Sequence, residues 1–224
     1  MREEPALNLK QVYTILKRDL KIEARRGYEL ISLAAFPMAA TLSFGYLYQN
    51  ADQPTLPFVF LWLTLLFTMV FTTVTSFIRE AERKTLFGLK ALPCSPMTLY
   101  LSKFLYTLFL NTILGTTTLG LIGIFIGLKT PLIPEFYLLF LLEVACLSAV
   151  SSFASALTMQ SEGKTLLLPF LVFLFSLPSA TAAMGASENL ISGLNFVTEL
   201  MLIVAYTMLI LFLSTFLIGY LLED

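Results

Sequence analysis

Six long runs of apolar residues constrain this chain more than any other feature of its sequence. A hydrocarbon core about 30 Å thick needs about 20 apolar residues in a helix that rises about 1.5 Å per residue. Runs of that length occur at 28–48, 58–78, 103–128, 136–159, 165–186 and 198–222. The strands of a membrane β-barrel would instead alternate polar and apolar residues over about 10 positions. We therefore predict an all-α polytopic membrane protein with six transmembrane helices.

The composition agrees with a protein that has lipid as its main solvent. Hydrophobic residues make up 57% of the 224-residue chain and charged residues only 13%, whereas an ordinary soluble domain is roughly 25% charged. A soluble protein of this size could not bury so much apolar surface. The first run is preceded by 27 residues rich in charge, and no cleavage-site pattern follows it, so we interpret it as a retained span and not as a signal peptide.

Lysines and arginines are distributed unevenly between the two sides of the predicted bundle. An even number of spans puts both chain ends on one side of the membrane. Seven basic residues precede the first span, five lie between the second span and the start of the third, and Lys164 follows the fourth, so only Lys129 lies opposite. The positive-inside rule then predicts cytoplasmic termini. We expect the protein in the cytoplasmic (inner) membrane of a prokaryote.

The segment before the first span has the pattern of an amphipathic helix at residues 9–26. Apolar residues recur at helical spacing, at Leu9, Val12, Tyr13, Leu16 and Leu20, and basic residues occupy much of the remaining surface. This pattern is typical of a helix in the membrane interface with its basic side chains at anionic lipid head groups. Packing on a soluble partner is the alternative. We accordingly separate an N-terminal cytoplasmic helix (1–27) from a six-helix transmembrane domain (28–224).

The inner connection 79–97, between the second and third spans, is longer than a turn requires. Charged residues precede a leucine ridge spaced i, i+3, i+6, and Pro93 and Pro96 then end the predicted short helix. Such a helix is suited to docking in a groove of another protein, and a solvated loop whose leucines dip into the interface is the alternative. The candidate docking residues are Glu80, Glu82, Arg83, Lys84, Thr85, Leu86, Leu89 and Leu92.

The order of these parts resembles the membrane subunit of a type-2 ABC exporter. In that family the inner loop carries a pattern close to Glu-x-Glu-Arg-Gly-Thr-Leu, followed by leucines and Pro-x-Ser/Pro. This chain has EAERKTL at 80–86, with Lys84 in place of the glycine and Phe87 where an acidic residue is common. Within the family the chain is most similar to the B subunit of the cytochrome c-maturation haem exporter, in its compact length and in the form of its fifth span.

The resemblance implies a non-catalytic subunit that couples ATP hydrolysis by a separate ATPase subunit to rearrangement of the membrane helices. It also implies two copies of the chain, other cytochrome c-maturation membrane proteins as partners, and haem as a substrate of the complex. We expect no cofactor, metal or nucleic acid on this chain. Histidine is absent, which removes Ser-His and Cys-His catalysis and axial His ligation of haem by this chain. A stand-alone secondary transporter or channel is the alternative, although no convincing internal repeat relates 28–128 to 136–222.

Glu143 and Ser151 are the candidate polar residues inside the fourth span. Charge within a span is costly, so Glu143 is a candidate to face a cavity or a partner subunit. The alternative is a position near the outer head groups, where the carboxylate is simply solvated. Ser151 follows at i+8, and we place it on the same helical face.

Glycines and prolines mark further positions in the spans. Gly123 and Gly127 form Gly-x-x-x-Gly, which permits close helix packing within the subunit or between subunits. Pro169 and Pro178 remove backbone hydrogen bonds from the fifth span, as happens where a helix bends or lines a pathway. Residues 187–196, before the sixth span, could form a short re-entrant or interfacial helix or an irregular outer loop.

The triplet Gly163-Lys164-Thr165 matches only the end of a phosphate-binding loop. The complete motif needs a glycine at the position of Thr158 and a strand before it, where this chain has a predicted membrane helix. We interpret 160–164 as a tight cytoplasmic turn in which Gly163 is free to adopt a positive φ.

We predict that the purified chain alone hydrolyses no ATP, because it has no complete phosphate cradle. Phosphate release with magnesium and ATP measures this directly, with Lys164→Ala as the control variant. Magnesium-dependent hydrolysis that Lys164→Ala abolishes would contradict the prediction.

Overall fold

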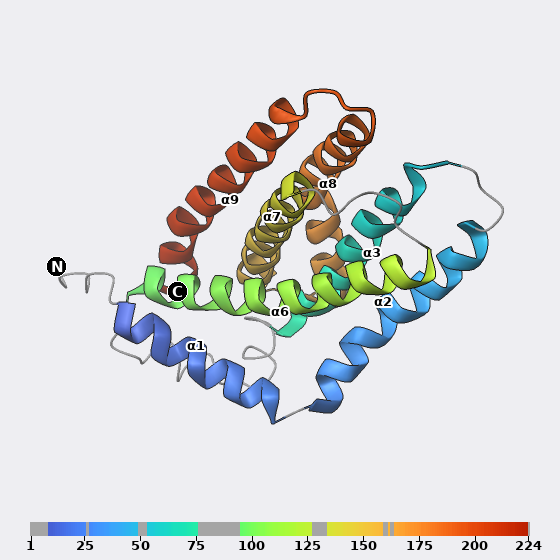
Figure 1. Cartoon of the computed structure of the whole chain (residues 1–224). Coiled ribbons are helices and arrows are strands. Elements are labelled where there is room, and N and C mark those ends of the chain that lie inside the picture. Colours follow the sequence, from blue (N-terminus) through green and yellow to red (C-terminus); the bar gives the residue numbers. More distant parts are fainter. Residues whose placement is uncertain are drawn as a thin grey trace.

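A computed structural model describes residues 9–25, 27–48, 53–75, 95–126, 134–158, 161 and 164–223. These residues form helices without strands: α1 (Leu9–Ala24), α2 (Gly27–Tyr48), α3 (Leu56–Thr73), α6 (Pro96–Phe125), α7 (Pro134–Thr158), α8 (Lys164–Ile191) and α9 (Val197–Glu223). Six of them, all except α1, are long and apolar enough to cross a membrane. The predicted all-α fold with six candidate spans is confirmed (Figure 1).

Helix α7 lies at the centre of the bundle and contacts α3, α6, α8 and α9. The second half of α7 carries many small residues with bulky ones between them, and almost all of its side chains are buried. Small side chains let neighbouring helices approach closely, which suits α7 to the central position. Helices α2 and α9 lie at the periphery, with only 17% and 22% of their apolar windows buried inside the monomer. Helix α1 lies alongside the first half of α6 (Figure 1).

Two groups of contacts define the two ends of the bundle. At the end where α6 begins, Ile15 of α1 shares a buried cluster with Leu99 of α6, Ala156 of α7 and Ile218 of α9. We call this the α1 end. At the opposite end, the Trp62 indole of α3 donates a 2.9 Å hydrogen bond to the Ser187 hydroxyl of α8. The spans therefore run alternately between these two ends.

Helix α6 begins earlier than the hydrophobicity of the sequence indicates. The predicted span started at 103, but the helix starts at Pro96, so Pro96 begins α6 and does not end a preceding helix. The Ser95 hydroxyl accepts a 3.2 Å hydrogen bond from the backbone N–H of Thr98. A serine cap followed by proline at the first helical position is a strong helix start, and it precedes the apolar part of the span.

The connection between α8 and α9 is shorter than the segment 187–196 for which a re-entrant or interfacial helix or an irregular outer loop was predicted. Helix α8 continues to Ile191, no separate helix follows, and only 192–196 form a turn and a short irregular connection. The backbone N–H groups of Gly193 and Leu194 donate to the carbonyls of Leu190 and Asn189 at 3.3 and 2.8 Å. Gly193 has a φ of +67°, so this is a Schellman motif with glycine at its left-handed position.

The glycines of α6 pack differently from the prediction. A Cβ added at Gly120 or Gly123 would meet no atom of the described chain within 4 Å, so Gly123 makes no close contact with another described helix, and Gly127 lies outside the described residues. The close approach occurs instead at Gly115, where an added Cβ would lie 3.0 Å from the Phe140 ring of α7. Gly115 has no glycine four residues away, which is why the spacing of glycines did not identify it.

We predict that Gly115→Leu destabilises the protein by about 1–3 kcal/mol, because the added side chain overpacks the contact between α6 and α7. Gly120→Leu is the matched control on the same helix. The free energy of unfolding of this variant should lie within about 1 kcal/mol of that of the unsubstituted protein, because leucine has a higher helix propensity than glycine and its side chain meets no described neighbour. Detergent-induced unfolding of both variants measures the difference, and equal stabilities would contradict the packing at Gly115.

Candidate functional site

The predicted ATPase-docking residues lie in a part of the chain that the structure does not describe. They are Glu80, Glu82, Arg83, Lys84, Thr85, Leu86, Leu89 and Leu92. The described chain resumes at Ser95, the N-cap of α6. Helix α6 is therefore the span that receives the chain from the candidate docking segment, 79–94.

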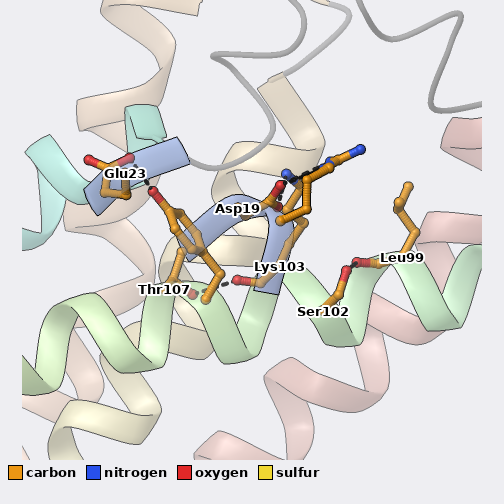
Figure 2. A network of polar contacts seen from close by, with 8 residues as sticks. Asp19, Glu23, Leu99, Ser102, Lys103 and Thr107 are labelled. Atoms are coloured by element: carbon orange, nitrogen blue, oxygen red, sulfur yellow. Dashed lines mark hydrogen bonds and ion pairs between the residues drawn. The ribbon is translucent and has the colours of Figure 1, made fainter. Parts of the chain in front are cut away.

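A buried ion pair joins α1 to α6. The Lys103 ammonium lies 2.8 Å from a carboxylate oxygen of Asp19, and the two side chains are only 3% and 8% exposed. Arg18 contacts the other carboxylate oxygen of Asp19 at 2.9 Å from a partly exposed position. Figure 2 shows Asp19 and Lys103 facing each other between the two helices. We call the pair Asp19–Lys103 the ionic joint.

A second polar contact lies one turn farther along α1. The Tyr106 hydroxyl of α6 donates a 2.8 Å hydrogen bond to the Glu23 carboxylate (Figure 2). Ionic and charge-assisted bonds are stronger than neutral ones, and burial limits screening by solvent. The two contacts, spaced by four residues on α1, hold this helix against α6 in one register.

The buried face of α1 differs from the face that the apolar pattern predicted. Val12, Ile15, Asp19 and Glu23 are buried, whereas Leu9 and Tyr13 are 70% and 64% exposed. The pattern considered apolar side chains only, and it missed the two acids. The sequence did contain a signal for the two acids: they are four residues apart and continue the helical face that begins with Val12 and Ile15. Location of α1 in the membrane interface stays a prediction.

Buried hydroxyl and amide groups form a second site where α3, α6 and α7 meet. We call it the polar seam: Thr72, Thr73, Tyr100, Asn111, Ser148, Ser151 and Ser152. Its centre is Asn111 of α6, which accepts a 2.7 Å hydrogen bond from Thr72 of α3 and donates a 3.0 Å bond to Ser148 of α7. Asn111 escaped the sequence analysis because one amide in a long apolar run has no pattern.

The remaining contacts of the polar seam extend along both sides of Asn111. Ser151, a candidate from the sequence, pairs with Thr73 of α3 at 2.9 Å. Tyr100 pairs with Ser152 at 3.1 Å. A hydrogen bond between membrane helices contributes about 0.6 kcal/mol on average. Because each is weak, the polar seam sets the register of α3, α6 and α7 more than it adds to their stability.

Glu143 is buried away from the polar seam. The side chain is 1% exposed, so the alternative of solvation at the head groups is wrong. Neither carboxylate oxygen has a hydrogen-bond partner among the described residues. The Ser179 hydroxyl of α8 donates a 3.1 Å hydrogen bond to the Ser176 carbonyl of its own helix.

Only one of the two candidate side chains in α7 makes an interhelical hydrogen bond. Ser151 pairs with Thr73 of α3, whereas Glu143 has no hydrogen-bond partner among the described residues. Eight residues at about 3.6 per turn leave the two side chains roughly 80° apart, which is within the width of one helical face, so their common face stays a prediction.

Pro169 and Pro178 lie within one helix, since α8 continues through both positions. The Thr181 hydroxyl donates to the carbonyls of Leu177 and Pro178 at 3.0 Å each. These are the carbonyls four and three residues before Thr181, the usual partners of a threonine hydroxyl in a helix, and not the Leu174 carbonyl that Pro178 leaves without an N–H donor. The described structure brings neither proline to the ionic joint or the polar seam.

A family model described as CcmB protein matches residues 10–223. The chain belongs to the CcmB protein family. No curated protein matches the chain. The family and the six apolar helices make this an integral membrane protein of the haem-exporter type, a membrane subunit of cytochrome c maturation. The family model covers both α1 and α6, and therefore both partners of the ionic joint.

The described ranges contain few groups that could bind a metal ion. No three Cys, Asp or Glu side chains there lie close enough together to hold a metal ion. The polar residues that the described structure does bring together are mainly hydroxyls and amides, which connect helices.

We predict a coupling energy of about 0.6 kcal/mol between Asn111→Leu and Thr72→Val in a double-mutant cycle, since the two side chains share one interhelical hydrogen bond. Detergent-induced unfolding of the two single variants and the double variant measures it.

The matched control pairs Asn111→Leu with Thr118→Val. Thr118 is buried on the same helix, but its hydroxyl donates to Leu114 of its own helix. The coupling energy in the control pair should be zero within error. Equal coupling energies in both pairs would contradict the hydrogen bond between α3 and α6.

Proposed function

We propose that this chain is the transmembrane subunit of an ABC-type haem-export complex and couples ATP hydrolysis on a separate ATPase subunit to movement of its membrane helices. Membership of the CcmB protein family supports the haem-exporter part of this proposal. The observation that carries the coupling part is the position of 79–97. The sequence of this segment resembles an ABC coupling loop, and the chain continues from it directly into α6, the helix that bears the ionic joint and part of the polar seam.

Force that enters through the docking segment would reach several helices at once. Helix α6 spans 30 residues, which corresponds to about 45 Å at the rise of an α-helix. Helix α6 contacts α1 through Lys103 and Tyr106, and it contacts α3 and α7 through Asn111 near its middle. A displacement of Ser95 along or across the membrane would therefore be shared among these elements.

The orientation and partners of the complex follow from the same proposal. The α1 end faces the cytoplasm, as the positive-inside rule requires of the basic residues, and it meets the ATPase there. ATP binds to that partner. Six spans are half of the usual membrane assembly, so a second copy completes it, and the exposed surfaces of α2 and α9 are available to this copy, to lipid or to other cytochrome c-maturation proteins.

Several candidate residues keep proposed roles within this complex. Gly123, open on its outer side, is a candidate for close contact with another membrane protein. Glu143 is a candidate polar group for helix rearrangement, because movement of α8 against α7 would change its surroundings. Haem is the substrate of the complex, and without histidine this chain offers it no axial imidazole ligand.

We predict that the double charge reversal Glu80→Lys and Glu82→Lys weakens binding of the ATPase subunit by about 10-fold or more, because like charges would then meet across the docking surface. Co-purification of the ATPase with tagged chain, followed by titration of the interaction in detergent, measures the loss.

The control is Glu135→Lys with Glu188→Lys, which makes the same change of charge at exposed positions in α7 and α8, away from the α1 end. The control should retain the ATPase at full yield. Full retention by the Glu80 and Glu82 variant, with normal ATP hydrolysis, would show that another segment makes the docking contact.

A further inference from the structure

Helix α1 is fastened to α6 more firmly than a helix that only rests on a membrane surface needs to be. Two acids of α1 point inward to meet Lys103 and Tyr106. Burying charged groups is costly unless they are paired, so these residues restrict α1 to one position on α6. Basic side chains such as Lys17 and Lys21 lie on the exposed side of the helix, where lipid head groups can reach them.

The ionic joint lies close to the point where the docking segment enters the bundle. Lys103 is within the first third of α6, which begins at Pro96. The cluster of Ile15, Leu99, Tyr100, Ala156 and Ile218 adds apolar contact from α1 to α6, α7 and α9 at the same end. The neighbourhood of the joint thus combines a charged contact with an apolar one, and both link α1 to the start of α6.

We propose that the ionic joint makes α1 and the first third of α6 move as one body, so that α1 transmits the force of ATP hydrolysis and is not only a membrane anchor. This inference rests on the proposed function. Asp19 and Lys103 are positioning residues in it, because they touch neither ATP nor haem. Release of the joint would let α6 move without α1, and ATP hydrolysis would continue while export fails.

The test uses the complete complex with its ATPase and compares two readouts. One is ATP hydrolysis by the purified complex, and the other is the yield of covalently haem-loaded cytochrome c in cells. Lys103→Met should keep hydrolysis within about twofold of the unsubstituted complex and lower the cytochrome c yield roughly tenfold, a typical size for coupling between distant sites. Lys103→Arg should keep both readouts, because arginine preserves the charge and can reach Asp19.

A matched control separates the ionic joint from the loss of one positive charge. Lys17→Met removes the same charge two residues from Asp19, on the exposed side of α1. It should leave both readouts unchanged. An equal fall of the cytochrome c yield in Lys17→Met and Lys103→Met would overturn the proposal.

The double variant Asp19→Asn with Lys103→Met separates transmission from simple stability. In Lys103→Met the buried Asp19 carboxylate loses its buried cation and keeps the contact with the partly exposed Arg18, which costs stability, whereas removing both charges of a buried pair is often neutral. The double variant should therefore regain the thermal stability that Lys103→Met loses, yet still uncouple hydrolysis from export. Recovery of both stability and cytochrome c yield would mean that the pair serves stability alone, and would overturn the proposal.

Failure of the proposed function would have a different signature. If the unsubstituted chain retains no ATPase subunit on purification, the coupling role itself is wrong. If it retains an active ATPase and Lys103→Met keeps the full cytochrome c yield, only the transmission role of α1 is wrong.

Discussion

Hydrocarbon offers no hydrogen-bonding partner, and this constraint explains most of the hydrogen bonds that the described residues make. Backbone groups are satisfied within helices, because an unsatisfied group in lipid costs several kcal/mol. Many hydroxyls follow the same rule. Thr41, Thr68, Ser176 and Ser214, for example, each donate to the carbonyl four residues earlier in the same helix. The hydrogen-bonding capacity of these hydroxyls is used within their own helices, so relatively few polar groups remain to connect one helix with another.

Many of those polar groups gather between the start and the middle of α6. Lys103 and Tyr106 face α1, Tyr100 faces α7, and Asn111 joins α3 to α7. Beyond Asn111, the helix packs through Gly115 and apolar side chains. Polar contacts are directional and specify register, whereas apolar packing in lipid permits more sliding. Helix α6 is therefore most tightly specified at the α1 end, next to the segment proposed to receive force from the ATPase.

Much of the fold could be predicted from the sequence, and less of the site. The six spans follow from hydrophobicity, because lipid selects long apolar helices whatever their neighbours are. The start of α6 at Pro96 and the turn at Gly193 have local signals in Ser95-Pro96 and in glycine, but hydrophobicity alone does not locate them. Contacts between helices leave almost no local signal, and Asn111 and Gly115 illustrate this.

The sequence by itself determined the solvent of this protein, its helices and its family, since length, hydropathy and the order of segments are properties of the chain alone. Tertiary structure decided which side of each helix is buried. It turned Asp19 and Glu23 inward and left Leu9 and Tyr13 exposed, and it buried Glu143 without a hydrogen-bond partner among the described residues. The physical reason is that a buried charge is tolerable only opposite a partner, and Lys103, which pairs with Asp19, comes from a helix far along the chain.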